Sequence, residues 1–102
     1  MAFRKGQILK ILARRADGDG FIFKELDKKA YEHDYKGFNF FLYKIGRYWS
    51  ANEYSSGAHI CGMSKTKSDC INILEIIIDN KGQEEVSNAI SRTIDEFGYA
   101  NI

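Results

Sequence analysis

The chain has no proline, and it has only two cysteines, two histidines and one tryptophan in 102 residues. It also lacks a long apolar run, because the longest, Ile76–Ile78, is far too short to span a bilayer. Charged residues at Arg4, Lys5 and Lys10 interrupt the start of the chain, so no secretory signal peptide is expected there. These absences argue against membrane and secreted proteins, and we expect a cytoplasmic protein without a membrane partner.

The net charge of +1 argues against a surface built entirely for nucleic acid. The charge is nevertheless uneven, because residues 1–50 hold 11 basic and 6 acidic side chains, whereas residues 51–102 hold 4 and 8. The two halves therefore carry +5 and −4. A basic half can orient the protein on a charged partner. Alternatively, two solvated helices simply differ in sign, and the sequence leaves both interpretations open.

Residue types that carry catalysis are sparse. The sequence contains no Gly-x-Ser-x-Gly, phosphate loop, His-Glu-x-x-His or dinucleotide fingerprint. The run from Glu32 to Asp34 combines acids with an imidazole, but sequence neighbours need not converge in space. Cys61 and Cys70 are interpreted as reduced, buried thiols, and together with His59 they match no common zinc spacing. We therefore expect no enzymatic activity, no cofactor and no metal site.

Hydrophobic periodicity predicts a single α+β domain over residues 1–102. In residues 4–16, Ile8, Leu9 and Leu12 recur at helical spacing, which predicts an amino-terminal amphipathic helix. A turn follows at residues 17–20, because aspartate and glycine alternate there. Residues 24–36 are polar and fit either a short helix or an irregular strand.

Residues 38–62 predict a three-stranded antiparallel meander. Residues 38–45 are rich in aromatic and β-branched side chains, and Gly46-Arg47 fits a two-residue hairpin loop. Counting from that loop pairs Ile45 with Tyr48 and Leu42 with Ala51. A second turn at residues 55–57 leads to a short third strand.

The carboxyl-terminal half predicts a helical hairpin packed on the sheet. The first helix covers residues 65–79, where Ser64 or Thr66 fits the capping position, and the second covers residues 83–97. Gly82 lies between them at a helix stop. A winged helix is the alternative, with residues 37–48 as its recognition helix and residues 49–62 as its wing.

Side-chain alternation gives the predicted sheet two faces. The face expected to cover the helices holds Phe38, Phe40, Leu42, Trp49 and Ala51, and the other holds Phe41, Tyr43, Ile45, Tyr48 and Tyr54. Lys44 and Arg47 flank the second face, which could anchor a protein or stack against nucleic-acid bases. The alternative is that an amino-terminal helix or strand covers it.

Residues 40–73 carry a resemblance to known proteins. They read FFLYKIGRYWSANEYSSGAHI and then SKTKSDCI after three residues. This resembles small proteins of phages and mobile elements, in which a Trp-containing hairpin and a Ser/Thr-Gly turn precede a Thr-Lys that opens a helix. It is also similar to the three-strands-plus-helix DNA-binding domain of phage-type integrases. The first resemblance implies an inhibitor of host defence, and the second implies DNA contact near Arg47, Trp49 and Lys65.

Taken together, these patterns predict a small non-enzymatic binding protein, encoded by a phage or mobile element, that inhibits or regulates a host protein. The alternative is a DNA-binding transcriptional regulator that uses the sheet or a winged helix. A second copy of the chain is a further candidate partner, since a half-covered sheet can pair with itself. The candidate partner-binding residues are Tyr43, Lys44, Arg47, Tyr48, Trp49, Tyr54, Lys65 and Lys67.

Overall fold

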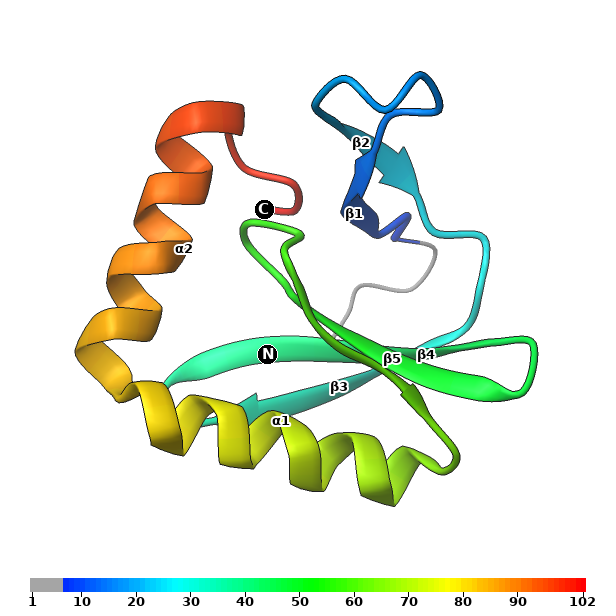
Figure 1. Cartoon of the computed structure of the whole chain (residues 1–102), viewed down its shortest axis with the longest axis vertical. Coiled ribbons are helices and arrows are strands. Elements are labelled where there is room, and N and C mark those ends of the chain that lie inside the picture. Colours follow the sequence, from blue (N-terminus) through cyan, green and yellow to red (C-terminus); the bar gives the residue numbers. More distant parts are fainter. Residues whose placement is uncertain (1–6) are drawn as a thin grey trace.

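The computed structural model describes residues 7–102, in which six strands precede two helices (Figure 1). The elements are β1 (Lys10–Arg14), β2 (Phe21–Glu25), β3 (Ala30–Tyr35), β4 (Phe38–Ile45), β5 (Tyr48–Glu53), β6 (His59–Ser64), α1 (Lys67–Lys81) and α2 (Gln83–Phe97). Strands β1 and β2 form a hairpin, and β3 to β6 form an antiparallel sheet in sequence order. The predicted α+β class is therefore confirmed.

The predicted meander is confirmed, with one more strand than expected. Strands β4 and β5 pair Ile45 with Tyr48 and Leu42 with Ala51, as counting from the Gly46-Arg47 loop predicts. The added strand is β3, which lies in the segment that the sequence left ambiguous and pairs along β4. Residues 37–48 are therefore not a recognition helix, and the winged-helix alternative is wrong.

The predicted amino-terminal helix is wrong for the residues that the structure describes, and positions 4–6 lie outside them. Lys10–Arg14 is a strand, paired with β2 from Lys10 opposite Glu25 to Arg14 opposite Phe21. Closely spaced isoleucine and leucine residues suit a strand as well as a helix. The turn at residues 15–20 decides between them, because it brings Phe21–Glu25 back alongside as a pairing partner.

The two predicted helices are confirmed, and their ends follow from local chemistry. Thr66 caps α1, since its side-chain oxygen accepts a hydrogen bond of 3.0 Å from the Asp69 amide. Gly82 ends α1 at a positive φ of 84°, a conformation that costs glycine little. None of the described helices is long and apolar enough to cross a membrane.

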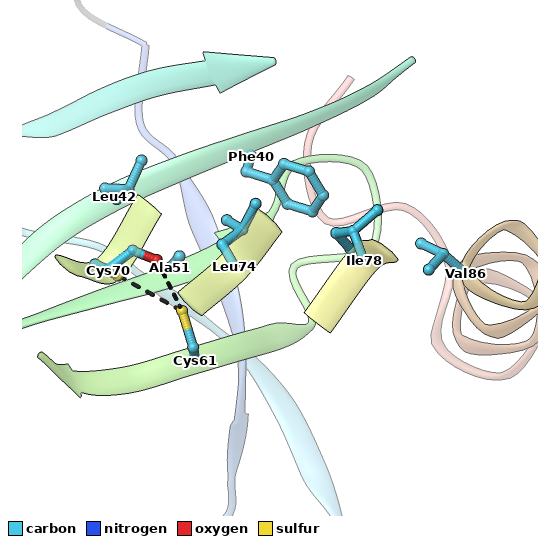
Figure 2. Close-up of a cluster of buried hydrophobic side chains, with 8 residues drawn as sticks. All are labelled: Phe40, Leu42, Ala51, Cys61, Cys70, Leu74, Ile78 and Val86. Carbon is cyan, nitrogen blue, oxygen red and sulfur yellow. Dashed lines mark hydrogen bonds between the residues drawn. The ribbon is translucent and has the colours of Figure 1, made fainter. Parts of the chain in front are cut away.

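Helix α1 packs across one face of the four-stranded sheet and forms the main core (Figure 2). Cys70, Leu74 and Ile78 recur at four-residue spacing on α1 and are fully buried. They meet the face that the register prediction assigned to the helices, and the sheet residues in this core are Phe40, Leu42, Ala51 and Cys61. Burying a leucine or isoleucine of this kind contributes about 1.5–3 kcal/mol.

The opposite face of the sheet is covered by the β1–β2 hairpin and the segment that follows α2 (Figure 1). Leu9 packs there with the buried Phe41, Tyr43 and Tyr54. The carboxyl-terminal segment secures the hairpin through Asn101, whose Oδ1 accepts from the Lys10 amide at 2.8 Å. The side-chain nitrogen of Asn101, Nδ2, donates to the backbone carbonyls of Lys10 and Tyr54 at 2.9 and 2.8 Å.

The turn between β5 and β6 joins these layers. A buried Glu53 carboxylate accepts hydrogen bonds from the backbone amides and hydroxyls of Ser55 and Ser56. The carbonyl of Gly57 then accepts from the Leu12 amide at 2.8 Å. Gly57 has a φ of 72°, and a Cβ there would lie 2.8 Å from the Cβ of Ala100, so the close contact requires glycine.

Candidate partner-binding surface

The expectation that Tyr43 and Tyr54 lie on an exposed face is wrong. Their exposed fractions are 3% and 4%, because the β1–β2 hairpin covers this face of the sheet. The Tyr43 hydroxyl donates to Asn52 Oδ1 at 2.7 Å, and burial raises the pKa of Tyr43 to about 12. The alternative that the sequence left open, in which an amino-terminal helix or strand covers this face, therefore holds, and the covering segment is the β1–β2 strand hairpin.

The other six candidate residues gather at one end of the molecule. Lys44, Arg47, Tyr48 and Trp49 lie at the β4–β5 turn, to the right in Figure 1. Trp49 pairs with Ser64 at the end of β6, and the chain then leads through Lys65 and Lys67 into the first turn of α1. We call this region the hairpin end; it comprises Lys29, Tyr31, Lys44, Ile45, Arg47, Tyr48, Trp49, Met63, Lys65 and Lys67.

Aromatic rings and ammonium groups are layered within the hairpin end. Tyr31 packs against Trp49 with ring centroids 5.7 Å apart. The Lys67 ammonium lies 4.3 Å from the centroid of the Tyr31 ring, and Lys29 lies 5.3 Å from it. Such cation–π contacts contribute about 0.5–1 kcal/mol at exposed sites and hold long side chains in place. The positive charges are therefore anchored on an aromatic base.

Exposed apolar side chains accompany these charges. Met63 is 75% exposed, and Ile45 and Tyr48 are also on the surface. Met63 has a φ of 61°, a left-handed backbone conformation that is unfavourable for a residue with a side chain. Met63 therefore combines an exposed apolar side chain with an unfavourable backbone conformation, at the point where the β5–β6 register shifts.

The acidic residues of the carboxyl-terminal half lie mainly away from the hairpin end. Helix α2 stands on the opposite side of the molecule in Figure 1, and it carries Glu84, Glu85, Asp95 and Glu96 with a single cation, Arg92. Asp69 lies in the first turn of α1, two residues after Lys67, and Asp27 pairs with Lys28 at 3.9 Å. Helix α2 thus places acidic side chains away from the hairpin end, although Lys36 of the basic half pairs with Asp79 of α1.

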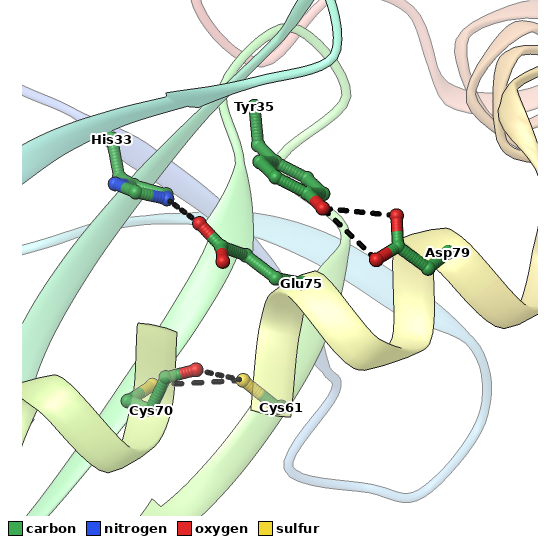
Figure 3. Close-up of polar contacts among 6 residues, drawn as sticks. All are labelled: His33, Tyr35, Cys61, Cys70, Glu75 and Asp79. Atoms are coloured by element: carbon green, nitrogen blue, oxygen red, sulfur yellow. Dashed lines mark hydrogen bonds and ion pairs between the residues drawn. The ribbon is translucent and has the colours of Figure 1, made fainter. Parts of the chain in front are cut away.

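Polar contacts between β3 and α1 form a second group of titratable side chains (Figure 3). His33 Nε2 lies 3.0 Å from Glu75 Oε2, and the Tyr35 hydroxyl donates to both carboxylate oxygens of Asp79. Hydrogen bonds from Lys36 and Tyr35 lower the pKa of Asp79. These contacts hold the helix against the edge strand.

The acid–imidazole run from Glu32 to Asp34 does not converge. Strand alternation sends His33 towards α1, whereas Glu32 and Asp34 both accept from the Asn39 side chain on the opposite face. Within residues 7–102, no group of three histidine, cysteine or acidic side chains is placed to hold a metal ion.

Lys29, Tyr31, Ile45 and Met63 of the hairpin end were not among the predicted binding residues. Lys29 and Tyr31 fall in the segment of ambiguous secondary structure, so their position beside Trp49 could not be deduced. Recognising β3 as a strand would have placed Tyr31 opposite Leu42 and thus on the α1 face. No sequence signal marks the backbone conformation of Met63.

Comparisons with known proteins leave the surface without a precedent. No protein-family model matches the chain, and neither the curated proteins nor the solved structures searched contain a match.

Proposed function

We propose that the protein is a non-enzymatic binding protein whose hairpin end contacts an acidic surface on a protein partner. The observation that carries the proposal is the exposed Met63, held at a positive φ two residues before Lys65. Protein interfaces combine an apolar or aromatic centre with a polar rim, and aromatic residues, methionine and arginine are enriched in them. Met63, Tyr48 and Ile45 would form the centre, and Arg47, Lys44 and Lys65 the rim.

The partner that the sequence resemblance supports is a host protein. Small phage-type proteins include inhibitors of host defence, and the resemblance of residues 40–73 to such proteins favours this role for the present chain. Binding at the hairpin end would then block or regulate that host protein without any chemical step. A cytoplasmic location follows from the same proposal, because the partner would be inside the host cell.

Nucleic acid is the second candidate ligand, and the observation that favours it is the layering of lysines on aromatic rings. Lysines could reach phosphates while rings stack on bases. Against this, the Tyr31 ring is already covered by the Lys67 ammonium at 4.3 Å, and Trp49 is half-buried. An exposed methionine and isoleucine also add little to contact with a phosphate backbone. Protein is therefore the better-supported partner.

The test compares two arginines at opposite ends of the molecule. Immobilised wild type, Arg47→Glu and Arg92→Glu are each incubated with host-cell lysate, and the retained proteins are identified by mass spectrometry. The two variants change the net charge equally, and both sites are exposed. We expect a protein retained by wild type and Arg92→Glu to decrease about tenfold with Arg47→Glu, as for a loss of about 1.4 kcal/mol. Equal retention by all three would rule out the hairpin end as the site.

A DNA titration separates the second candidate from the first. Mixed-sequence duplex and single-stranded DNA are titrated at about 50 and about 200 mM salt, because phosphate contacts weaken steeply as salt rises. We expect no saturable binding even at the lower salt. Binding that is salt-dependent and is lost in Arg47→Glu but not in Arg92→Glu would instead support nucleic acid as the ligand of the hairpin end.

A further inference from the structure

Two buried thiols flank the segment that carries Met63, Lys65 and Lys67 of the hairpin end. Cys61 in β6 and Cys70 in α1 have their sulfur atoms 3.5 Å apart (Figure 3). Cys61 also lies 3.7 Å from the Cys70 carbonyl oxygen, so the two residues face each other across the contact between strand and helix. They are the only cysteines in the chain. Any intramolecular disulfide in this protein must therefore join them.

The environment of Cys70 favours its thiolate. Cys70 is the fourth residue of α1, in the turn where the helix dipole stabilises negative charge. The hydrogen bond from Cys61 lowers the pKa of Cys70, whereas the same bond and burial raise the pKa of Cys61. The lower pKa makes Cys70 the attacking thiol, and the geometry places Cys61 to complete the exchange.

The residues between the two cysteines connect the thiols to the surface. Residues 62–69 run from the end of β6 into α1 and include Met63, Lys65 and Lys67 of the hairpin end. A disulfide has a sulfur–sulfur distance of about 2.05 Å, so the two sulfurs must approach by about 1.5 Å. This movement would be shared between β6 and the first turn of α1, which together hold the segment.

We propose that Cys61 and Cys70 form a reversible dithiol–disulfide switch that reshapes the hairpin end. The site reacts with low-molecular-weight disulfides such as oxidised glutathione. Its regulatory meaning rests on the proposed binding function, whereas its chemistry does not. In the reduced state the hairpin end has the geometry described above, and in the oxidised state residues 62–69 are closed into a covalent loop.

The exchange balances in two steps. The Cys70 thiolate attacks one sulfur of oxidised glutathione, the glutathione disulfide bond breaks, and one glutathione thiolate leaves. Cys61 then gives its proton to water and attacks the Cys70 sulfur of the mixed disulfide, which releases the second glutathione. Two protein thiols are oxidised and one glutathione disulfide is reduced. Because both thiols are buried, the reagent enters when the first turn of α1 opens locally.

The test measures disulfide formation without any partner. Wild type, Cys61→Ser and Cys70→Ser are equilibrated with glutathione buffers of increasing oxidised fraction, both folded and in urea, and then acid-quenched for intact mass. We expect folded wild type to lose two hydrogen atoms at an oxidised fraction about tenfold lower than the unfolded chain needs. Each single-cysteine variant should form only a mixed disulfide with glutathione.

Amide spectra of the reduced and oxidised protein test the link to the surface. We expect the amide resonances of Met63, Lys65 and Lys67 to shift on oxidation, while those of α2 stay in place. If folded wild type remains reduced where the unfolded chain is oxidised, or forms only glutathione adducts, the switch is excluded. If the disulfide forms and residues 62–69 do not shift, its effect on the hairpin end is excluded. Neither result bears on whether the reduced hairpin end binds a partner.

Discussion

Replacing Asn101 with alanine should loosen the hairpin that covers the second face of the sheet. The Asn101 side chain is 5% exposed and makes three hydrogen bonds, two to the Lys10 backbone and one to the Tyr54 carbonyl. The bonds to Lys10 cross 91 residues of sequence, so each one ties the start of β1 to the end of the chain. Alanine removes all three hydrogen bonds, so the Lys10 amide and the carbonyls of Lys10 and Tyr54 each lose this partner.

The expected cost follows from those three bonds. At about 1 kcal/mol each, their loss destabilises the protein by about 3 kcal/mol. Asn101→Asp sharpens the prediction, since it keeps the acceptor for the Lys10 amide but places a carboxylate oxygen against two carbonyl oxygens. We therefore expect aspartate, although similar in shape, to cost at least as much as alanine. If the Asn101 side chain stabilised the protein only by filling this space, aspartate, which has nearly the same shape, would be tolerated.

Urea unfolding followed by fluorescence provides the measurement, since Trp49 is the only tryptophan and lies within the sheet. The matched control is Asn88→Ala on the exposed side of α2, where alanine should be neutral or stabilise the helix by up to about 0.7 kcal/mol. Hydrogen exchange should accelerate at the β1 amides more than at those of β4. Either of two results would refute this role of the Asn101 hydrogen bonds. One is a destabilisation by Asn101→Ala of less than about 1 kcal/mol, and the other is an Asn101→Asp variant as stable as wild type.

Two other predictions test the same region. Because the pKa of Tyr43 is raised to about 12, the folded protein keeps this proton to a higher pH than the unfolded chain does, so the free energy of unfolding should be full below pH 10 and fall by about 2 kcal/mol towards pH 12. Urea unfolding of Tyr43→Phe should show a shallower decline over that range. Parallel declines in the two proteins would contradict the raised pKa of Tyr43. Gly57→Ala should lower the thermal unfolding midpoint more than Gly20→Ala does. Both positions have a positive φ, but only a Cβ at residue 57 would meet the Cβ of Ala100, at 2.8 Å. Equal shifts of the midpoint would show that this contact relaxes at no cost.

The fold was predictable wherever a local signal set the geometry. The Gly46-Arg47 loop fixes the β4–β5 register by counting, and Thr66 and Gly82 mark the ends of α1. The helix predicted at Lys10–Arg14 is wrong because the apolar spacing of this segment fits both helical and strand periodicity. Its strand form is decided by pairing with β2 and by the need to cover the sheet, neither of which is visible in a short window.

The clustering of the charged candidate residues was predictable, whereas the burial of Tyr43 and Tyr54 was not. Arg47 and Lys65 lie at the same end because a meander returns the end of β6 beside the β4–β5 turn. Tyr43 and Tyr54 were assigned to the surface because alternation identifies a second face but cannot show what covers it. Tyr31 was missed because its strand was not recognised. Long-range packing therefore accounts for each of these errors.

The coincidence of the hairpin end with the first turn of α1 has a kinetic consequence. The positive end of the helix dipole points in the same direction as the side-chain charges around Lys44, Lys65 and Lys67, while α2 carries the opposite sign on the far side. The two fields add, so the molecule would be turned towards an acidic partner before any contact forms. Salt should then slow association far more than it speeds dissociation. A protein with almost no net charge would thus still approach its partner along a preferred direction.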